Sequence, residues 1–412
     1  MTTEIAQIIR EAGGRVPFAR FMELALTHPR EGYYARAQHI LGQRGDFSTA
    51  PLLSPEFNEA IVVLVDELVQ ASLQAQVESE EGGVCNNKQE FWDSKKNCGD
   101  KEICKSEKNE TCSDVVLEAE RLAVVELGGG EGHLAMALLN YWQNNHADLQ
   151  SKISYCLVEV GEGLCLKQRE MLDSFIINGW DVRWGDTIAQ VCEGTSPVVI
   201  LGNEFLDALP VHVVEVSEAT AREAWVVLEE ESSNFVWQWG EITPSASVEM
   251  LSLWGTEDTK QLKTLSKDGI LELRPAVVDL LGEIDRLMPS GSLLFIDYGD
   301  WGPGQGRSVR GYFHHQLIDD PLARPGQQDL TADVNFAALD EHGRALGFEA
   351  VFFTSLSMFL AAALENPQCN LPLVLSDYSS DFLEADKRET VLQALLDEKN
   401  IGGVFKVILQ VR

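Results

Sequence analysis

The sequence is short of positive charge. Lysine and arginine together number 32, against 65 aspartates and glutamates, which gives a formal net charge of −33 over 412 residues. A surface of this sign repels nucleic acids and anionic membrane surfaces, and it attracts basic partners. Long apolar runs are also lacking, because none reaches the ~18 residues that a membrane span needs. We therefore expect no nucleic-acid partner and no membrane span.

Targeting signals and paired cysteines are similarly scarce. Residues 1–10 lack an apolar signal core and are not rich in Arg and Ser, so we expect a cytoplasmic protein. The eight cysteines include no Cys-x-x-Cys pair, which argues against a zinc site, and we predict no metal. Four of them fall in one polar stretch: Cys85, Cys98, Cys104 and Cys112. Nothing in the composition indicates an oligomeric state.

One glycine-rich stretch organises the interpretation of the whole chain. Residues 124–134 read Val-Val-Glu-Leu-Gly-Gly-Gly-Glu-Gly-His-Leu, which predicts a buried strand, a tight loop and the start of a helix. Gly128, Gly130 and Gly132 let a ligand approach the backbone closely. The unpaired N–H groups of the following helix face whatever binds there. This arrangement is typical of a nucleotide-binding strand-loop-helix unit.

The chemistry of this loop argues against a dinucleotide. His133 stands where a dinucleotide-binding loop would place its third glycine. Glu126 and Glu131 are poor neighbours for a pyrophosphate but suit a cation or an amine. The pattern Glu-x-Gly-x-Gly-x-Gly is typical of S-adenosylmethionine (SAM) methyltransferases, whose cofactor carries an amino group and a sulfonium and no phosphate.

Three further predicted strands also end in carboxylates. Glu159 follows the apolar run 153–158, Asp186 follows 181–185, and Glu204 follows 197–201. Strands that alternate with helices predict a parallel sheet covered on both faces. In such a sheet ligands bind at the carboxyl edge, near the point where the strand order reverses. We therefore expect these carboxylates and Glu126 to face one crevice.

The remaining chain divides by composition. Residues 1–77 predict a helical segment that also contains a turn-rich loop at 42–51, and residues 78–120 form a polar stretch that we interpret as a mobile insertion. Residues 121–412 would form the nucleotide domain, with an aromatic-rich, β-rich insertion at about 211–275.

Taken together, these motifs resemble the MidA family of SAM-dependent methyltransferases. The mitochondrial members of that family act in respiratory complex I assembly by methylating an arginine of a core subunit. The matching stretches are Gly32-Tyr33-Tyr34, Gly45-Asp46-Phe47, the loop at Gly128, Asn203-Glu204-Phe205, Asp207-Ala208-Leu209-Pro210, Asp297-Tyr298-Gly299, His315, Asp329-Leu330-Thr331 and Phe405-Lys406-Val407. The chain departs from the family at Gly129 and Glu131, where Pro and Arg are common.

The resemblance implies an α/β fold, with a Rossmann-like class I SAM methyltransferase sheet, an N-terminal helical segment and an inserted antiparallel β/α subdomain. It also implies SAM as the cofactor. We predict that Gly128, Gly130 and Gly132 contact its methionine and ribose parts and that Glu126 lies near its amino end. Glu159 would accept hydrogen bonds from the ribose hydroxyls, because a carboxylate can take two donors.

Two more positions complete the predicted cofactor site. Asp186 would lie near the adenine, and Asp46 would close over the cofactor from the early loop. The bland interpretations are an ordinary acid at the end of a strand for Asp186 and a turn former for Asp46.

The predicted acceptor is an arginine of a basic protein partner, and paired carboxylates would hold it. An arginine stays cationic, and carboxylates bind its planar group through forked hydrogen bonds. Glu204 and Asp207 are the natural pair, with Asn203 orienting them. The alternative is the start of a helix that Asn203 caps. His315 and Asp329 are weaker candidates for contact with the substrate.

Two other functions stay open. Asn203 and Glu204 would also suit methylation of a small molecule or of a nucleic-acid base, although the acidity argues against nucleic acid. A third hypothesis is an assembly factor that binds SAM without turnover, and the acid at Glu131 keeps it open.

Overall fold

The structure is a computed structural model, and the statements below concern the residues that it describes: 3–35, 55–80, 121–229, 234–266, 268–302, 306–314, 316–365 and 382–412. Three groups of predicted features lie outside these ranges. They are the loop at 42–51 with Asp46, His315, and nearly all of the polar stretch 78–120 with its four cysteines.

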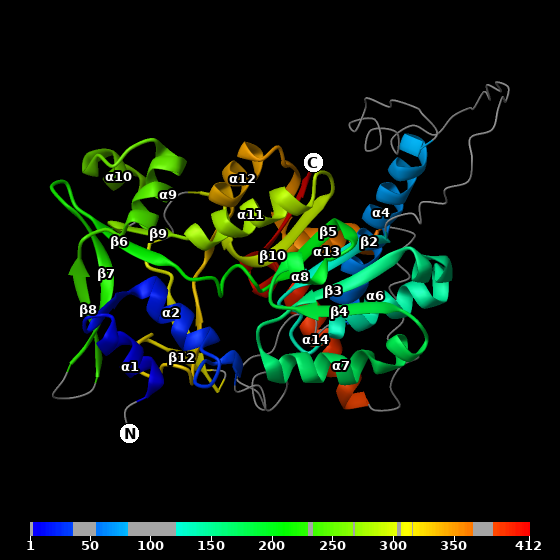
Figure 1. The fold of residues 1–412 in the computed structure, drawn as a ribbon, viewed down its shortest axis with the longest axis horizontal. Helices are drawn as coiled ribbons and strands as arrows, with labels where there is room; N and C mark the ends of the chain where they lie inside the picture. Colours follow the sequence, from blue (N-terminus) through cyan, green and yellow to red (C-terminus); the bar gives the residue numbers. More distant parts are fainter. Residues whose placement is uncertain are drawn as a thin grey trace.

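A mixed sheet forms the larger half of the molecule (Figure 1). Its order is β15-β16-β10-β5-β2-β3-β4, and β14 pairs with the end of β10. The strands are β2 (Arg121–Leu127), β3 (Ile153–Val158), β4 (Asp181–Gly185), β5 (Thr195–Asn203), β10 (Ser292–Asp300), β14 (Val334–Asn335), β15 (Glu349–Ser355) and β16 (Phe405–Val411). The neighbours from β4 to β10 are parallel, and β16 is antiparallel to both of its neighbours.

The strand order reverses between β2 and β5. From β2 the chain moves outward through β3 to β4, whereas β5 and β10 lie on the other side of β2. A crevice therefore opens at the carboxyl ends of β2 and β5, where ligands bind in doubly wound sheets. The predicted Rossmann-like sheet is confirmed.

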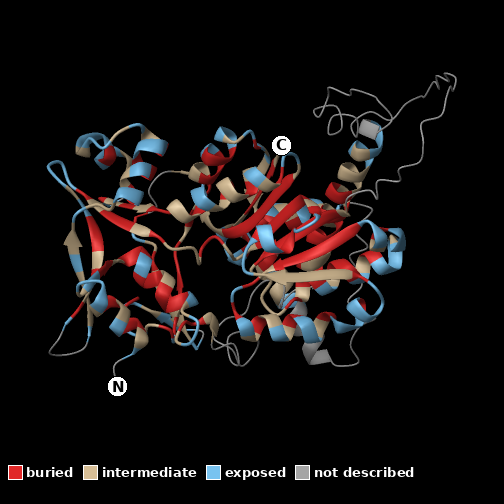
Figure 2. Cartoon of the chain, viewed as in Figure 1, coloured by how far each residue is buried: buried red, intermediate tan, exposed pale blue. Residues whose placement is uncertain are grey.

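Helices cover both faces of this sheet, which is why its strands read as apolar runs. Leu122 to Leu127 are all buried (Figure 2). One face carries α4 (Pro55–Glu80), α6 (His133–Asn145) and, at its edge, α7 (Glu162–Ile177). The other carries α8 (Ile188–Val191), α11 (Pro275–Leu287) and α12 (Phe336–Ala345). Three further helices, α13 (Leu356–Leu364), α14 (Phe382–Leu396) and α15 (Ile401–Val404), complete this half.

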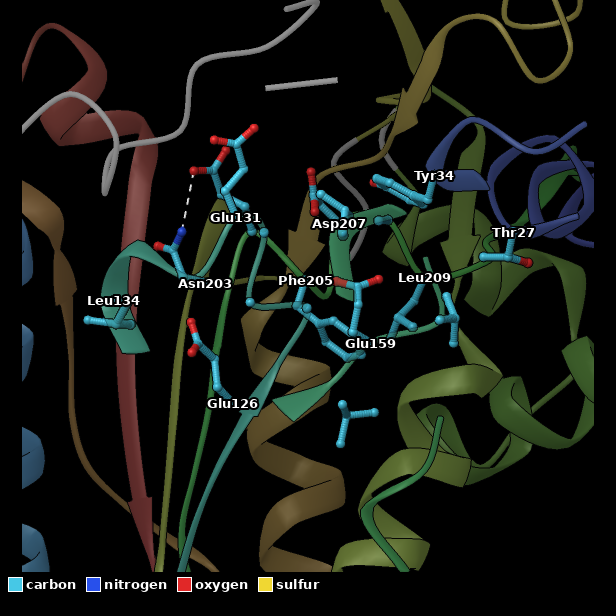
Figure 3. A pocket seen from close by; sticks show the side chains of 18 of the residues that line it. Thr27, Tyr34, Glu126, Glu131, Leu134, Glu159, Asn203, Phe205, Asp207 and Leu209 are labelled. Atoms are coloured by element: carbon cyan, nitrogen blue, oxygen red, sulfur yellow. Dashed lines mark hydrogen bonds between the residues drawn. The ribbon is translucent and has the colours of Figure 1, made fainter. Parts of the chain in front are cut away.

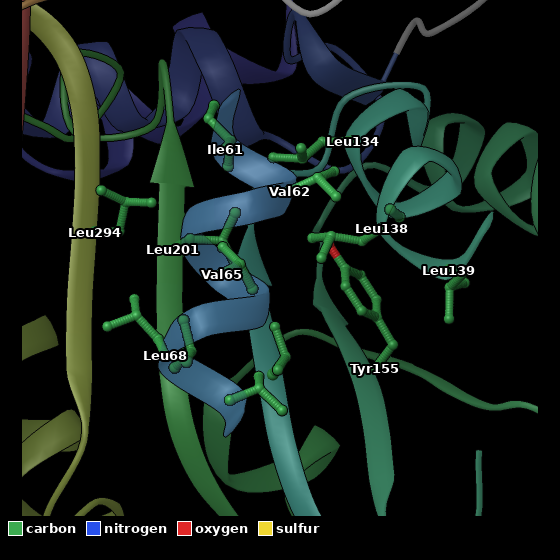
Figure 4. Packing of buried hydrophobic residues seen from close by; sticks show 14 of the residues in the cluster. Ile61, Val62, Val65, Leu68, Leu134, Leu138, Leu139, Tyr155, Leu201 and Leu294 are labelled. Carbon is green, nitrogen blue, oxygen red and sulfur yellow. The ribbon is translucent and has the colours of Figure 1, made fainter. Parts of the chain in front are cut away.

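Helix α4 is long and apolar enough to span a membrane by length and composition alone. In the structure, however, it packs on the sheet. Ile61, Val65 and Leu68 lie in the same buried cluster as Leu201 and Leu294 of β5 and β10, as Figure 4 shows. Its apolar side is therefore engaged in the core.

A second lobe is built on an antiparallel sheet. Its strands are β1 (Arg15–Pro17), β6 (His212–Val216), β7 (Ala221–Leu228), β8 (Phe235–Gly240) and β9 (Ile270–Leu273). Side chains alternate between its faces. Val213 packs against α1 (Glu4–Glu11) and α2 (Phe18–Thr27), whereas Val214 packs against α9 (Pro244–Trp254) and α10 (Thr259–Leu265). The predicted antiparallel β/α subdomain and N-terminal helices are thus confirmed.

The predicted N-terminal helical segment divides between the two lobes. Strand β1 pairs with β7, so α1, β1 and α2 belong to the core of the second lobe, whereas α4 belongs to the main sheet. A small sheet of β11 (Arg310–Phe313), β12 (Gln316–Ile318) and β13 (Asp329–Thr331) also contacts α2. A short 3₁₀ helix, η2 (Ala147–Ser151), precedes β3.

Candidate active site

A cavity of about 300 Å³ opens at the carboxyl edge of the main sheet. Most of the predicted site residues line it, from the ends of β2, β3, β4 and β5 and from the second lobe (Figure 3). These lining residues are Glu126, Gly128, Gly130, Glu159, Asp186, Asn203, Glu204, Asp207 and Asp329. Gly132 is instead the residue before α6, with a left-handed φ of 92°. Asp46 and His315 lie outside the described residues.

The cavity wall is strongly acidic. Seven carboxylates line it, and the described lining residues include no lysine or arginine. One of the seven, Glu131 of the glycine loop, is balanced by a lysine that does not line the cavity, because its carboxylate lies 2.6 Å from Lys167 Nζ. Its other oxygen lies 3.6 Å from His133 Nε2. The negative charge that replaces the family's common arginine is therefore compensated by a lysine on α7.

Glu126 is a buried carboxylate beneath the glycine loop. It is 4% exposed and accepts a 2.7 Å hydrogen bond from the Tyr155 hydroxyl. Burial raises the pKa of Glu126 to about 7, and the bond from Tyr155 opposes that shift. Among the described residues, no other group donates a hydrogen bond to Glu126. Such a carboxylate can accept a proton, or bonds from an ammonium group, at neutral pH.

Glu159 follows β3 and faces the same cavity. It accepts bonds from the Gly161 N–H at 2.7 Å and from the Gln168 amide at 3.4 Å. Burial raises the pKa of Glu159 to about 7, and the Gly161 bond opposes the shift. Gln168 also donates to the Gly130 carbonyl at 2.8 Å, so one side chain ties Glu159 to the glycine loop.

Gly128, in the glycine loop, packs against the segment that follows β5. Its φ is 65°, in the region that favours glycine. A Cβ at this position would lie 3.0 Å from the Phe205 ring. The loop therefore packs directly on the residue between Glu204 and Leu206.

Asp186 follows β4 at the far end of the cavity. It is exposed, and its backbone N–H donates to the Gln190 side chain at 2.8 Å. Its carboxylate is available at the position that we predict for the adenine.

Glu204 has a strained backbone. It is one of three residues other than glycine with positive φ among those described, and its φ is 51°. Such strain concentrates at functional sites. Each of its carboxylate oxygens has a hydrogen-bond donor beside it. Tyr298 donates to one at 3.0 Å, and the Asn203 amide lies 3.4 Å from the other. Residues 204–210 form turns before β6, so the alternative of a helix capped by Asn203 is wrong.

Asp297, on β10, holds this turn in place. Its Oδ2 accepts from the backbone N–H groups of Phe205, Leu206 and Asp207 at 3.2, 2.8 and 3.1 Å, and its Oδ1 accepts from Tyr298 N–H. The residue is fully buried. Burial and repulsion from Asp207 raise the pKa of Asp297 well above its usual range, while the backbone donors oppose them.

Asp207 lies next along the turn and is also buried. It accepts a 2.6 Å bond from the Thr331 hydroxyl, and its carbonyl accepts from Ala332 N–H at 3.1 Å. Burial raises the pKa of Asp207, and the bond from Thr331 and the charges of Arg274 and Arg310 oppose the shift. These contacts join the turn to β13, where Asp329 begins the strand.

Three residues with a part in this geometry were missing from the predicted site. Asp297 accepts hydrogen bonds from the turn, and Tyr298 donates one to Glu204. Tyr34 lines the cavity beside Asp329. A signal existed for the first two, because Asp297 and Tyr298 follow the apolar run 292–296 and belong to one of the matching stretches. Tyr34 also stands in a matching stretch, Gly32-Tyr33-Tyr34, but it follows no predicted strand at that edge.

The residues present fit SAM. The cavity offers carboxylates that can pair with an ammonium, a sulfonium or hydroxyl groups, and apolar side chains such as Leu134, Val158 and Leu209 supply the remaining wall. Asn203 Oδ1 is buried without a hydrogen-bond partner among the described residues, so it is free to accept a donor from a ligand. Within these same residues, no group of three His, Cys, Asp or Glu side chains is placed to hold a metal.

Fold and site together define a SAM-dependent methyltransferase. Residues 110–354, more than half of the chain, match the family described as "Putative S-adenosyl-L-methionine-dependent methyltransferase", and the chain belongs to this family. The relatives below include proteins of the MidA type, so the predicted resemblance is confirmed. SAM is the cofactor.

Curated relatives and a solved structure agree with this assignment. The mouse and zebrafish proteins named protein arginine methyltransferase NDUFAF7, mitochondrial, are 26% and 27% identical over 79% and 80% of this chain. The chain spans only 66% and 68% of their lengths. A Burkholderia thailandensis protein, called a "likely methyl transferase" and bound to S-adenosyl-homocysteine, is 26% identical, with a TM-score of 0.72. The match covers 99% of this chain and 90% of that one.

The expectation of a cytoplasmic protein is wrong by this comparison. The relatives are named as mitochondrial proteins in mouse, zebrafish and Caenorhabditis elegans. That expectation rested on the composition of ten residues, which is a weak basis for locating a protein.

Proposed function

We propose that the protein transfers a methyl group from SAM to an arginine guanidinium of a basic protein partner. Following the MidA resemblance, the partner would be a subunit of the respiratory complex I type. The observation that carries the proposal is Glu204, which combines a strained backbone with a carboxylate directed by two donors. The names of the relatives support arginine as the acceptor.

The cavity suits a cationic acceptor better than a neutral one. Seven carboxylates surround it without a lining lysine or arginine among the described residues. A guanidinium is planar and always charged, and it donates bonds to carboxylates in pairs. A small neutral acceptor would leave Glu204 and Asp207 without a cation to bind, so the charge of the site favours arginine over most small molecules.

Positioning is the main contribution of these residues. When bound, SAM supplies an electrophilic methyl group on its sulfonium sulfur. We assign Glu126 to the amino end of the cofactor, Glu159 to its ribose and Asp186 to the adenine side, with Gly128 and Gly130 in close backbone contact. Glu126 and Glu159 lie at the ends of the adjacent strands β2 and β3, so one extended ligand can contact both.

Glu204 and Asp207 would hold the acceptor. As a guanidinium nitrogen gains a carbon it must release a proton, and we assign its uptake to the Glu204 carboxylate. Tyr298 and Asn203 keep that carboxylate in one orientation. Asp207, anchored by Thr331, would bind a second nitrogen and balance its charge. Orientation of this kind lowers the barrier without new covalent chemistry on the protein.

The test has two stages. First, isothermal titration measures binding of SAM and S-adenosyl-homocysteine to the purified full chain. Second, the chain and its Glu204→Gln variant are incubated with deuterated-methyl SAM and a mitochondrial extract, and mass spectrometry locates the label. The expected result is label on arginine with the wild-type chain only, although both proteins bind the cofactor.

Other outcomes would contradict the proposal in distinct ways. Label on lysine, or on small molecules alone, would overturn the choice of acceptor. Binding of SAM with no label anywhere would favour the third hypothesis, an assembly factor that binds SAM without turnover. A folded chain that binds neither SAM nor its product would remove the methyltransferase interpretation.

A further inference from the structure

The second lobe contributes its own side chains to the cavity. Thr27 ends α2, Tyr34 follows shortly after it, and Asp329 begins β13, yet all three line the same cavity as the glycine loop. In Figure 3, Tyr34 and Thr27 lie on the right of the view, Glu126 and Asn203 lie on the left, and Asp207 lies between them. The cavity thus has one wall from each lobe.

Tyr34 is held firmly against Asp329. Its hydroxyl donates to Asp329 Oδ1 at 3.3 Å. Its ring meets the Tyr33 ring edge-on, with the centroids 5.4 Å apart. Tyr33 is 3% exposed in the core of the second lobe, and its N–H donates to the Ala25 carbonyl. The ring of Tyr34 therefore keeps a fixed position at the cavity wall.

Two arginines whose charges act on Asp207 also bond to neighbouring groups. Arg310 donates to Asp333 at 2.6 Å, and Arg274 donates to the carbonyls of Leu209, Ala332 and Asp333. Neither lines the cavity. Asp329 and Asp207 line the cavity beside the Tyr34 ring.

Tyr34 stays a neutral phenol in this setting. Burial raises its pKa well above the usual range, and the charges of Asp329 and Asp207 add to that effect. A neutral ring offers its negative face to a cation, while its hydroxyl keeps Asp329 in place. A carboxylate next to an aromatic face suits a guanidinium, which is planar, charged and able to stack.

We propose that Tyr34 and Asp329 form an acceptor subsite, which binds the non-reacting edge of the guanidinium and selects a planar cation over a neutral group. This inference rests on the proposed function and adds separate roles for two pairs of residues. Glu204 and Asp207 act on the reacting nitrogen, whereas Tyr34 and Asp329 determine which side chain enters.

A pair of synthetic probes tests the subsite without knowledge of the natural partner. Both are adenosine derivatives with an alkyl arm at the 5′ position. One arm ends in a guanidine and the other in a urea, which has the same shape but no charge. Isothermal titration with the full chain gives the ratio of the two affinities. S-adenosyl-homocysteine affinity and thermal unfolding report separately on the cofactor site and on folding.

The wild-type chain is expected to prefer the guanidine probe by about tenfold or more, the value of one charge-assisted hydrogen bond. Asp329→Asn should remove most of that preference, and Tyr34→Ala should reduce it by about fivefold, a typical cation–π contribution. S-adenosyl-homocysteine should bind all of these proteins equally. Asp319→Asn is the matched control, because it removes the same charge from an exposed position of the same lobe.

Kinetics with an arginine-containing peptide, once one is found, would add a second readout. The Asp329→Asn variant should raise KM more than it lowers kcat, because the lost contact binds the acceptor before and during transfer alike. A general loss of structure would instead lower cofactor affinity as well.

The outcomes separate the two proposals. If S-adenosyl-homocysteine binds but the guanidine and urea probes bind equally, the subsite is overturned and the cofactor site stands. A preference that survives both Asp329→Asn and Tyr34→Ala has the same consequence. If a folded chain binds neither S-adenosyl-homocysteine nor the probes, the proposed function itself fails.

Discussion

The cavity has a cofactor wall, with Glu126 and Glu159, and an acceptor wall, with Glu204, Asp207, Tyr34 and Asp329. The contacts that form the two walls join residues at very different separations in the sequence. On the cofactor wall, Glu126 bonds to a residue 29 positions away, and the partners of Glu159 lie 2 and 9 positions away. On the acceptor wall, Leu206 reaches Asp297 over 91 positions, Asp207 reaches Thr331 over 124, and Tyr34 reaches Asp329 over 295. Adjacent strand-helix units build the first wall, whereas the second wall joins segments that are distant in the chain.

The carboxylates of the two walls also differ in how they are held. Glu126 and Glu159 are buried with few donors, all of them uncharged, and their pKa values rise to about 7. Glu204 and Asp297 belong to one bonded turn with a strained backbone. The cofactor wall therefore leaves hydrogen-bonding capacity for a ligand, whereas the acceptor wall uses much of its capacity to hold its own shape.

The largest effect is expected from Asp297→Ala, which breaks the acceptor wall. Three backbone N–H groups of the turn, and that of Tyr298, would lose a buried acceptor. We expect the free energy of unfolding to fall by about 3 kcal/mol, measured by urea denaturation. Asp297→Asn keeps one acceptor oxygen and should cost less. Equal stability of the alanine variant and the wild type would contradict this account of the turn.

Gly128→Val should damage both walls, because Gly128 packs on Phe205. The positive φ and the short contact predict a loss of about 2 kcal/mol in stability. Titration should also show SAM affinity at least about tenfold lower, since backbone approach is blocked. Gly194→Val is a useful control, because Gly194 also has positive φ but open space around it. Similar SAM affinities in the two variants would argue against close approach at Gly128.

The pH dependence of SAM binding tests the cofactor wall alone. With pKa values of about 7, Glu126 and Glu159 are largely protonated in the free protein at pH 6. The proposed contacts with SAM need them ionised, so its affinity should weaken by about fivefold between pH 7 and pH 6 for each group involved. Titration at pH 6, 7 and 8 measures this change. Glu126→Gln should flatten the profile, and an unchanged slope would exclude Glu126 from the site.

The stability of the free protein should change in the opposite direction. The folded-state pKa of each of these groups is raised above the unfolded value of 4.5. Their contribution to stability is therefore full below about pH 4.5 and is lost as the pH rises to about 7. Thermal unfolding across this window, with and without SAM, should show a ligand-induced increase in Tm that grows with pH.

The smallest effect is expected from Tyr155→Phe, which removes the single donor to Glu126. The bond from Tyr155 lowers the pKa of Glu126, so the variant should move the midpoint of SAM binding to higher pH. Stability should fall by about 1 kcal/mol. Tyr141→Phe, a partly buried tyrosine on the neighbouring helix, is a control for the loss of a hydroxyl. A midpoint that stays in place would show that Tyr155 does not tune Glu126.

Much of the cofactor wall was accessible from the sequence. The run from Val124 to Leu127 is buried on both faces of the sheet, and such strands leave a plain apolar signature. The carboxyl ends of parallel strands must meet at one edge, so Glu126, Glu159 and Glu204 could be brought together without coordinates. The same rule would have reached Asp297, at the end of β10, had it been applied there.

The sequence by itself thus determined the doubly wound sheet, the glycine loop and the line of acids along one edge, because each rests on local periodicity and on a general rule of topology. Only the tertiary structure decided that β1 joins β7, that Asp297 holds the turn at Glu204, and that Tyr34 meets Asp329. Contacts across such separations depend on how segments that are distant in the chain pack together. Packing of that kind leaves no repeating pattern in the residues that make it.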